Sequence, residues 1–339
     1  MIHLITPKGI LRFVGLAAAV MMLSRCSDTT TEDSSTLGDW VKQSSYEGVA
    51  RSGAVGFVID GIAYVGTGFT GDKWLKDFYR YDASKNNWYR IADLPGPARS
   101  AAVAFTIEGK GYVGTGYDGT SYLKDFYAYD PTANKWDTIP ELEGSARFEA
   151  AAFSIDGKGY VLTGFDGNYL KDMYAYDPIA NAWTQKSSYS GDKLINAFAF
   201  AIDGYGYIGG GLNNGILNQE FWSYDPLDDL WTEKNDLQDD DNDDDENDSG
   251  YTVARSLGGS FVINGKGYVC LGTRSSLNAE VWEYNPSTDT WEELTSFEGA
   301  MREATVGFAI GDKGYITTGR QSTYRYDDLW QFDPTAEEE

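Results

Sequence analysis

The sequence predicts an all-β chain folded as a six-bladed β-propeller, a closed ring of four-stranded sheets. Tryptophan, phenylalanine and glycine each recur six times in one register, with spacings of 47 or 48 residues and one longer step of 60 or 61. The tryptophans are Trp40, Trp88, Trp136, Trp183, Trp231 and Trp291. The phenylalanines are Phe57, Phe105, Phe153, Phe200, Phe261 and Phe308. A repeat of this length with several short strands is typical of a propeller blade.

Each repeat contains four segments with the residue pattern of short β-strands, as its second copy shows. Ala101–Ile107 is small and apolar, and Tyr112–Gly116 follows it after a glycine-containing turn. Phe126–Tyr129 alternates, which places its two tyrosines on one face, and Lys135–Thr138 carries the repeat tryptophan. Period-two alternation over such short runs indicates strands whose faces differ in burial.

The position of the chain end predicts how the ring closes. A seventh tryptophan would fall where the sequence ends, so the sixth repeat has only three of its strands. The segment Trp40–Ser44 stands alone before the first repeat and has the pattern of a fourth strand. We expect it to pair with Leu329–Phe332 and to cover an edge that would otherwise favour aggregation.

The repeated residues resemble those of kelch repeats. The tyrosine-to-tryptophan spacing of the family is kept five times: Tyr81–Trp88, Tyr129–Trp136, Tyr176–Trp183, Tyr224–Trp231 and Tyr284–Trp291. The glycine pair of the family is complete only at Gly210-Gly211, and elsewhere its second member alone remains. The resemblance extends from Trp40 to Pro334 and implies a kelch-type propeller over residues 39–339.

Composition excludes several classes of function. With 27 Lys and Arg against 52 Asp and Glu, the net charge is −25, which excludes binding to nucleic acid through phosphate neutralisation. The one histidine, His3, lies in the predicted leader, so a mature chain has no histidine for a catalytic triad or for metal ligation. The two cysteines leave no disulfide framework. We therefore expect no metal site of this kind, and a copper oxidase like galactose oxidase is excluded.

The first residues predict export. Residues 1–25 combine Lys8 and Arg12 with an apolar run that is too short to span a bilayer, as in a signal peptide. The sequence ending at Cys26 resembles a bacterial lipobox, which implies that Cys26 carries the lipid. Residues 26–38 are rich in Ser, Thr and Asp and predict a flexible tether. The expected product is an outer-membrane or cell-surface lipoprotein that contacts the membrane only through this anchor.

Arginines recur at the predicted start of the innermost strand, six residues before the repeat phenylalanine. They are Arg51, Arg99, Arg147, Arg255 and Arg302, and the fourth repeat has Leu194 there with Lys193 beside it. One interpretation is a cationic ring at the channel mouth that binds a carboxylate or another acidic group. The resemblance supports it, because arginines at this position line ligand pockets in kelch proteins. The alternative is that each arginine pairs with a carboxylate of a neighbouring blade or stacks on an aromatic ring.

The loops between the second and third strands add aromatic residues to the predicted binding face. We select Trp74, Tyr122 and Tyr169 as ligand-binding candidates, because aromatic rings beside polar groups suit a glycan or a peptide. The alternative is that these rings pack against adjacent loops. A carboxylate also recurs before each third strand, which indicates a structural turn-capping role and no part in a site. These carboxylates are Asp77, Asp125, Asp172, Glu220, Glu280 and Asp328.

An acidic insertion at residues 238–250 separates the fourth and fifth repeats. Residues 239–248 hold eight acids in ten positions, which is typical of a disordered, solvated loop. The segment from Asp245 to Gly250 also matches the opening of an EF-hand loop, but Ser256 stands where that motif has its final glutamate. We therefore predict no cofactor, with calcium at residues 239–248 as the alternative.

Taken together, these patterns favour a monomeric surface binding protein for a glycan, peptide or other acidic ligand. Two alternatives stay open. One is a structural or protein-docking lipoprotein. The other is a sialic-acid mutarotase, because the chain also resembles, distantly, the six-bladed N-acetylneuraminate epimerase of bacteria. In that case Glu149, two residues after Arg147, is the catalytic candidate.

Overall fold

The computed structural model describes residues 37–238 and 251–337. The predicted signal peptide, Cys26, most of the tether and residues 239–250 of the acidic insertion lie outside the described residues. Within the described ranges every regular element is a β-strand. That part of the chain accordingly contains no helix long and apolar enough to cross a membrane.

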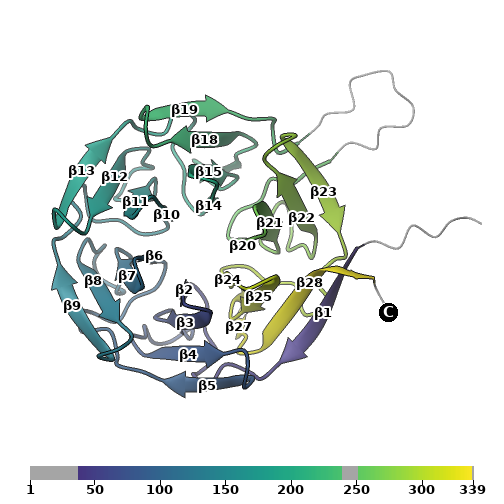
Figure 1. Cartoon of the computed structure of the whole chain (residues 1–339), viewed down its shortest axis with the longest axis horizontal. Helices are drawn as coiled ribbons and strands as arrows, with labels where there is room; N and C mark the ends of the chain where they lie inside the picture. The colour runs from purple at the N-terminus through teal and green to yellow at the C-terminus, as the bar shows by residue number, and fades with distance from the viewer. Residues whose placement is uncertain (1–36, 239–250, 338–339) are drawn as a thin grey trace, which may run out of the picture. The chain divides into compact units, whose positions relative to one another are not determined.

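The strands form six antiparallel four-stranded sheets around a central channel, which confirms the predicted six-bladed propeller (Figure 1). Blade 1 contains β2 (Val55–Ile59), β3 (Ile62–Gly66), β4 (Phe78–Asp82) and β5 (Asn87–Arg90). Blade 2 contains β6 (Val103–Ile107), β7 (Lys110–Gly114), β8 (Phe126–Asp130) and β9 (Lys135–Ile139). Blade 3 contains β10 (Ala151–Ile155), β11 (Lys158–Leu162), β12 (Met173–Asp177) and β13 (Ala182–Lys186).

Blades 4 and 5 follow the same order, and blade 6 takes one strand from the N-terminal end. Blade 4 contains β14 (Phe198–Ile202), β15 (Tyr205–Gly209), β18 (Phe221–Asp225) and β19 (Leu230–Glu233). Blade 5 contains β20 (Gly259–Ile263), β21 (Lys266–Cys270), β22 (Val281–Asn285) and β23 (Thr290–Leu294). Blade 6 contains β24 (Val306–Ile310), β25 (Lys313–Thr317), β28 (Leu329–Glu337) and β1 (Leu37–Gln43). Two short hairpins stand in the loops between second and third strands: β16 (Leu212–Asn213) with β17 (Ile216–Leu217), and β26 (Arg320–Gln321) with β27 (Tyr324–Arg325).

The repeat phenylalanine explains why most second strands carry a glycine. Phe57 of blade 1 reaches into blade 2, where a β-carbon on Gly111 would lie 2.0 Å from its ring. Any larger residue at this position would separate the blades or displace the ring. The same close approach recurs at Gly159, Gly206, Gly267 and Gly314. These contacts place the hydrophobic core between successive blades, around the ring.

The tyrosine-to-tryptophan spacing joins each blade to the one before it. In blade 2, the Tyr129 hydroxyl donates to Asn134 Oδ1 (2.9 Å), and the same oxygen accepts the N–H of Ala92 in the preceding loop (3.0 Å). Two residues later, Trp136 Nε1 donates to the Ala92 carbonyl (2.9 Å). Asn134 and Trp136 therefore satisfy the backbone N–H and the carbonyl of Ala92, which follows the outer strand β5 of blade 1.

The N-terminal strand closes the ring as predicted. Strand β1 pairs antiparallel with β28, and Trp40, opposite Phe332, is buried against Phe332 and Phe297. It begins at Leu37, two residues before the predicted start of the propeller, and ends at Gln43. Ser44 then makes the same two bonds as Ala92: its N–H donates to Asn86 Oδ1 (2.9 Å), and its carbonyl accepts from Trp88 Nε1 (3.0 Å). Residues 37–44 thus connect the last blade with the first.

Removing this strand should abolish cooperative unfolding. A variant that lacks residues 1–45 loses the whole β1–β28 ladder, the buried Trp40 and the bonds to Ser44, and it exposes the edge of β28. We expect broad, non-cooperative melting in calorimetry and association in light scattering. A control that lacks residues 1–36 should melt in one sharp transition. Equal sharpness in both variants would show that β1 does not close the ring.

Candidate functional site

The loops that join fourth to first strands and those that join second to third strands share one side of the ring, here called the loop face. Short antiparallel bridges connect the two sets within each blade, for example Ser52 with Phe69 and Ser100 with Tyr117. This arrangement confirms the expected shared face.

Six backbone hydrogen bonds form a closed ring where the channel meets the loop face. The N–H of each participating residue donates to the carbonyl of its equivalent in an adjacent blade, at 2.8 to 3.1 Å. The members of this amide ring are Gly53, Ala101, Glu149, Asn196, Leu257 and Ala304. All six have left-handed backbones, with φ between 52° and 60°. A non-glycine residue in this conformation costs about 1–3 kcal/mol, so the surrounding structure must impose it.

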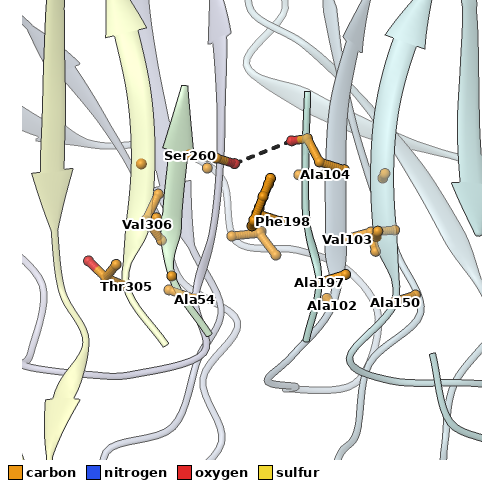
Figure 2. A pocket seen from close by; sticks show the side chains of 18 residues that line it. Ala54, Ala102, Val103, Ala104, Ala150, Ala197, Phe198, Ser260, Thr305 and Val306 are labelled. Atoms are coloured by element: carbon orange, nitrogen blue, oxygen red, sulfur yellow. Dashed lines mark hydrogen bonds between the residues drawn. The ribbon is translucent and has the colours of Figure 1, made fainter. Parts of the chain in front are cut away.

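Below the amide ring, the channel is lined by no charged side chain and by few polar ones. Its cavity of about 180 Å³ is lined by small and apolar residues of the six innermost strands, as Figure 2 shows for Ala54, Ala150 and Val306. Ser260 is one of its few polar residues, and its hydroxyl donates to the Ala199 carbonyl (3.2 Å). Ligand chemistry therefore belongs to the mouth above, where a second cavity of about 170 Å³ includes the whole amide ring.

The five repeated arginines are buried beneath the loop face, each with 0–1% of its surface exposed. In blade 2, the Arg99 guanidinium makes two parallel hydrogen bonds of 2.7 Å to the carboxylate of Asp125. Its Nη1 also donates to the Thr115 carbonyl (3.0 Å), and its Nε donates to the Pro97 carbonyl (3.1 Å). Arg51, Arg147 and Arg302 repeat this arrangement with Asp77, Asp172 and Asp328. We call these residues, with Arg255, the clasp arginines.

The structure therefore assigns Arg51, Arg99, Arg147, Arg255 and Arg302 a structural role and corrects their assignment as a ligand-binding ring. A guanidinium with no exposed surface and protein acceptors on its three nitrogens cannot reach a ligand. The partner carboxylate lies in the same blade, which corrects the expected pairing with a neighbouring blade. The expected stacking on aromatic rings is present for four of the five, for example Arg99 over Tyr127 at 5.8 Å. The carboxylates before the third strands are structural as predicted, but mainly as arginine partners and not as turn caps.

Blades 4 and 5 depart from the regular clasp. Arg255 meets Glu280 at 3.4 Å, and burial lowers its pKa to about 10. In blade 4, the buried Leu194 replaces the arginine. The Glu220 carboxylate there accepts the backbone N–H of Asp192 (3.1 Å).

Half-buried aromatic rings form a continuous arc over blades 1 to 3. The ring-to-ring distances are 4.5 Å for Phe69–Trp74, 5.9 Å for Trp74–Tyr117 and 5.7 Å for Tyr117–Tyr122. The arc continues through Phe148 and Phe165 to Tyr169. The structure thus brings the predicted residues Trp74, Tyr122 and Tyr169 into one surface feature. Their packing against adjacent loops, expected as an alternative, is also present.

The opposite side of the mouth is polar. Arg320 Nε donates to Glu303 Oε1 (2.8 Å), and the Thr273 hydroxyl donates to Glu303 Oε2 (2.7 Å). Across the mouth in blade 3, burial raises the pKa of Glu149, although an Asn196 hydrogen bond and the charge of Arg320 oppose this effect. Glu149 is therefore a partly desolvated carboxyl group whose pKa also responds to charges of blade 6.

Arg320 and Arg325 are mouth residues that sequence reasoning missed. They are register partners in the β26–β27 hairpin, and the Arg325 guanidinium lies 5.9 Å from the Phe69 ring at one end of the arc. Burial and the neighbouring charge of Arg320 lower the pKa of Arg325. Among the described residues, no carboxylate forms an ion pair with Arg325. Alignment of the repeats could have identified both, because Arg320 follows Gly319 as Phe69 follows Gly68.

Replacing one clasp arginine should destabilise the protein strongly. Arg99→Met leaves the Asp125 carboxylate partly buried without its partner, and such losses cost about 3–5 kcal/mol. Burial opposes ionisation of Asp125, but hydrogen bonds and the charge of Arg99 hold its pKa below the usual value. The loss should therefore persist at pH 7 and shrink only as the pH falls below about 4.

Chemical denaturation of both variants measures this effect. The control is Arg90→Met, which removes an exposed arginine paired with Asp93 and should cost less than about 1 kcal/mol. A similar small cost for Arg99→Met would contradict the structural assignment.

Comparison with known proteins agrees with this architecture. The family described as Kelch motif matches residues 98–143 and 146–188, which are blades 2 and 3. No curated protein matches the sequence. Among 905 matching chains of solved structures is one titled "Structure of YjhT", with a TM-score of 0.67 and 15% identity. The match covers 84% of this chain and 95% of that chain, and at this identity it shows the fold alone. The chain is thus a six-bladed β-propeller in which blades 2 and 3 match the kelch motif.

Proposed function

We propose that the chain is a binding protein that recognises a glycan or another acidic ligand at the mouth of its loop face. The observation that carries this proposal is the position of Arg325 beside the aromatic arc, where its guanidinium forms no ion pair among the described residues. Guanidinium groups bind carboxylates through charge-assisted hydrogen bonds, and aromatic faces bind apolar sugar faces.

The overall charge supports a local mode of capture. A chain with a net charge of −25 repels an anion at long range, so the ligand must gain its affinity from contacts made at the mouth. Arg320 is neutralised by Glu303, whereas Arg325 lies farther along the same hairpin. Arg325 is thus the preferred contact for an acidic group, and the rings of the arc are the preferred contacts for the rest of the ligand.

Arg325→Met should weaken the binding of acidic glycans at least tenfold and leave neutral glycans unchanged. One charge-assisted hydrogen bond contributes about 1.5–3 kcal/mol, which corresponds to a factor of ten or more. The measurement is a glycan array followed by calorimetry, with Arg90→Met as the matched control. Equal affinity of the parent and Arg325→Met for acidic glycans would refute the assigned contact. Absence of glycan binding by the parent would favour the protein-docking alternative.

A second candidate function is anomer exchange of a carboxylated sugar. The observation that favours it is Glu149, whose raised pKa suits proton transfer and which lies in the amide ring at the centre of the mouth. The charge of Arg320 lowers its pKa and that of Glu303 raises it. Glu149 would then be the base, and Arg320 the contact for the sugar carboxylate.

Glu149→Gln separates this candidate from simple binding. If Glu149 is a base, NMR exchange spectroscopy should show anomer exchange in the parent, slower exchange below the raised pKa, and none in Glu149→Gln. The substitution should also stabilise the fold more at pH 7 than at pH 4. The reason is that a raised pKa lowers stability as the pH rises through it. An unchanged exchange rate in the variant would exclude Glu149 as the base.

We also propose that the protein is exported and anchored through lipidated Cys26. The support is the sequence of residues 1–26, which lies outside the described residues. Cys26→Ser should abolish metabolic labelling with radioactive palmitate and release the protein from the membrane fraction. A labelled Cys26→Ser variant would contradict the proposal.

A further inference from the structure

A cavity of about 570 Å³ lies at the rim of the loop face between blades 2 and 3, away from the channel axis. We call it the rim pocket. It is lined by Tyr117, Thr120, Ser121, Tyr122, Ser145, Ala146 and Asp166. The volume falls in the range of small-molecule sites. Two tyrosine side chains, three aliphatic hydroxyl groups and one carboxylate therefore surround a single space.

A comparison with the junction between blades 1 and 2 shows why the rim pocket, at the junction between blades 2 and 3, is open. Between blades 1 and 2, the Trp74 ring lies over Gly119, where an added β-carbon would be 2.6 Å from the indole. The equivalent residues at the next junction are Tyr122 and Gly167. Tyr122 stacks on Phe148 at 5.0 Å, and an added β-carbon on Gly167 would meet nothing within 4 Å. The place that Trp74 fills at one junction is thus open at the next.

The polar residues of the rim pocket are suited to sugar hydroxyl groups. Thr120, Ser121 and Ser145 stand where the preceding junction has Asp72, Lys73 and Pro97. Burial opposes ionisation of Asp166, but hydrogen bonds from Ser145 and Asn168 lower its pKa, so the group is an anionic acceptor at neutral pH. A carboxylate accepts hydroxyl donors and repels other anions. The pocket therefore favours a neutral sugar ring.

The wall of the pocket is held by a clasp arginine. Arg147 Nε donates to the Ser145 carbonyl (3.1 Å), and its Nη2 contacts the Ser145 hydroxyl (3.4 Å). Arg147 is itself fixed by Asp172. Groups that are held in place before binding lose little conformational entropy when a ligand arrives.

Aromatic contacts connect the rim pocket with Arg325. Successive contacts run from Arg325 to Phe69 (5.9 Å), to Trp74 (4.5 Å) and to Tyr117 (5.9 Å), which lines the pocket. We propose that the rim pocket is a second subsite that holds a neutral sugar ring of an acidic oligosaccharide. In this arrangement the acidic group of the oligosaccharide contacts Arg325. This inference rests on the proposed glycan binding and specifies a chain of several sugars as the ligand.

Two variants test the subsite independently. Tyr122→Trp introduces the side chain that fills the equivalent place at the preceding junction, and Asp166→Asn removes the acceptor charge with little change of shape. Tyr89→Trp, in the outer strand of blade 1, is the control for the added indole. The probes are an array of neutral and carboxylated glycans of one to six sugars, and calorimetry with the tightest-binding chain and its acidic terminal monosaccharide.

We expect both variants to bind the oligosaccharide at least tenfold more weakly than the parent protein does. Affinity for the acidic monosaccharide should change less than twofold, because that contact lies at Arg325. Unchanged affinity of both variants for the oligosaccharide would overturn the rim subsite but would not contradict the proposed binding at the mouth. A parent that binds no glycan at all overturns the proposed function and the subsite with it.

Discussion

The buried ion pair between a clasp arginine and the carboxylate before the third strand is the interaction on which the loop face depends. Arg99 reaches Asp125, the Thr115 carbonyl and the Pro97 carbonyl, so one side chain fixes three loop segments. Removal of either charge leaves the other one desolvated and unpaired. Breaking this pair therefore lowers the free energy of unfolding far more than breaking an exposed pair does. The residues directly after the clasp arginines pair with the loops between second and third strands, and the next residues form the amide ring. The mouth is thus a rigid platform with the rims of its loops left for recognition.

The fold was predictable because the same residues perform the same contact in every blade. The tyrosine-to-tryptophan spacing survives since Tyr129, Asn134 and Trp136 together hold the preceding loop, and a change of spacing would break that set. The closing strand was predictable by counting tryptophans. Its end at Gln43, one residue before the predicted Ser44, was not, because composition does not separate the last strand residue from the following loop.

The candidate site was only partly predictable. Regular arginines at the strand starts have the same sequence pattern whether they face a ligand or a buried carboxylate, and only the position of Asp125 and its equivalents decides between these roles. Arg320 and Arg325 were missed because they replace aromatic residues of the first three repeats, and only an alignment of the repeats shows this. The rim pocket depends on where Tyr122 packs and on the open space beside Gly167, and neither is visible in a sequence. Regular features therefore identify the scaffold of this propeller, whereas departures from regularity mark the proposed binding surface.

Amide hydrogen exchange in the unliganded protein tests the central claim of a rigid, preorganised mouth most directly. The six N–H groups of the amide ring should exchange only through global unfolding, with free energies equal to those of the innermost strands. The N–H groups at the tips of the loops between second and third strands should exchange much faster. Rapid exchange at Gly53, Glu149 or Leu257 under native conditions would show that the ring opens locally, and a preformed platform would then be contradicted.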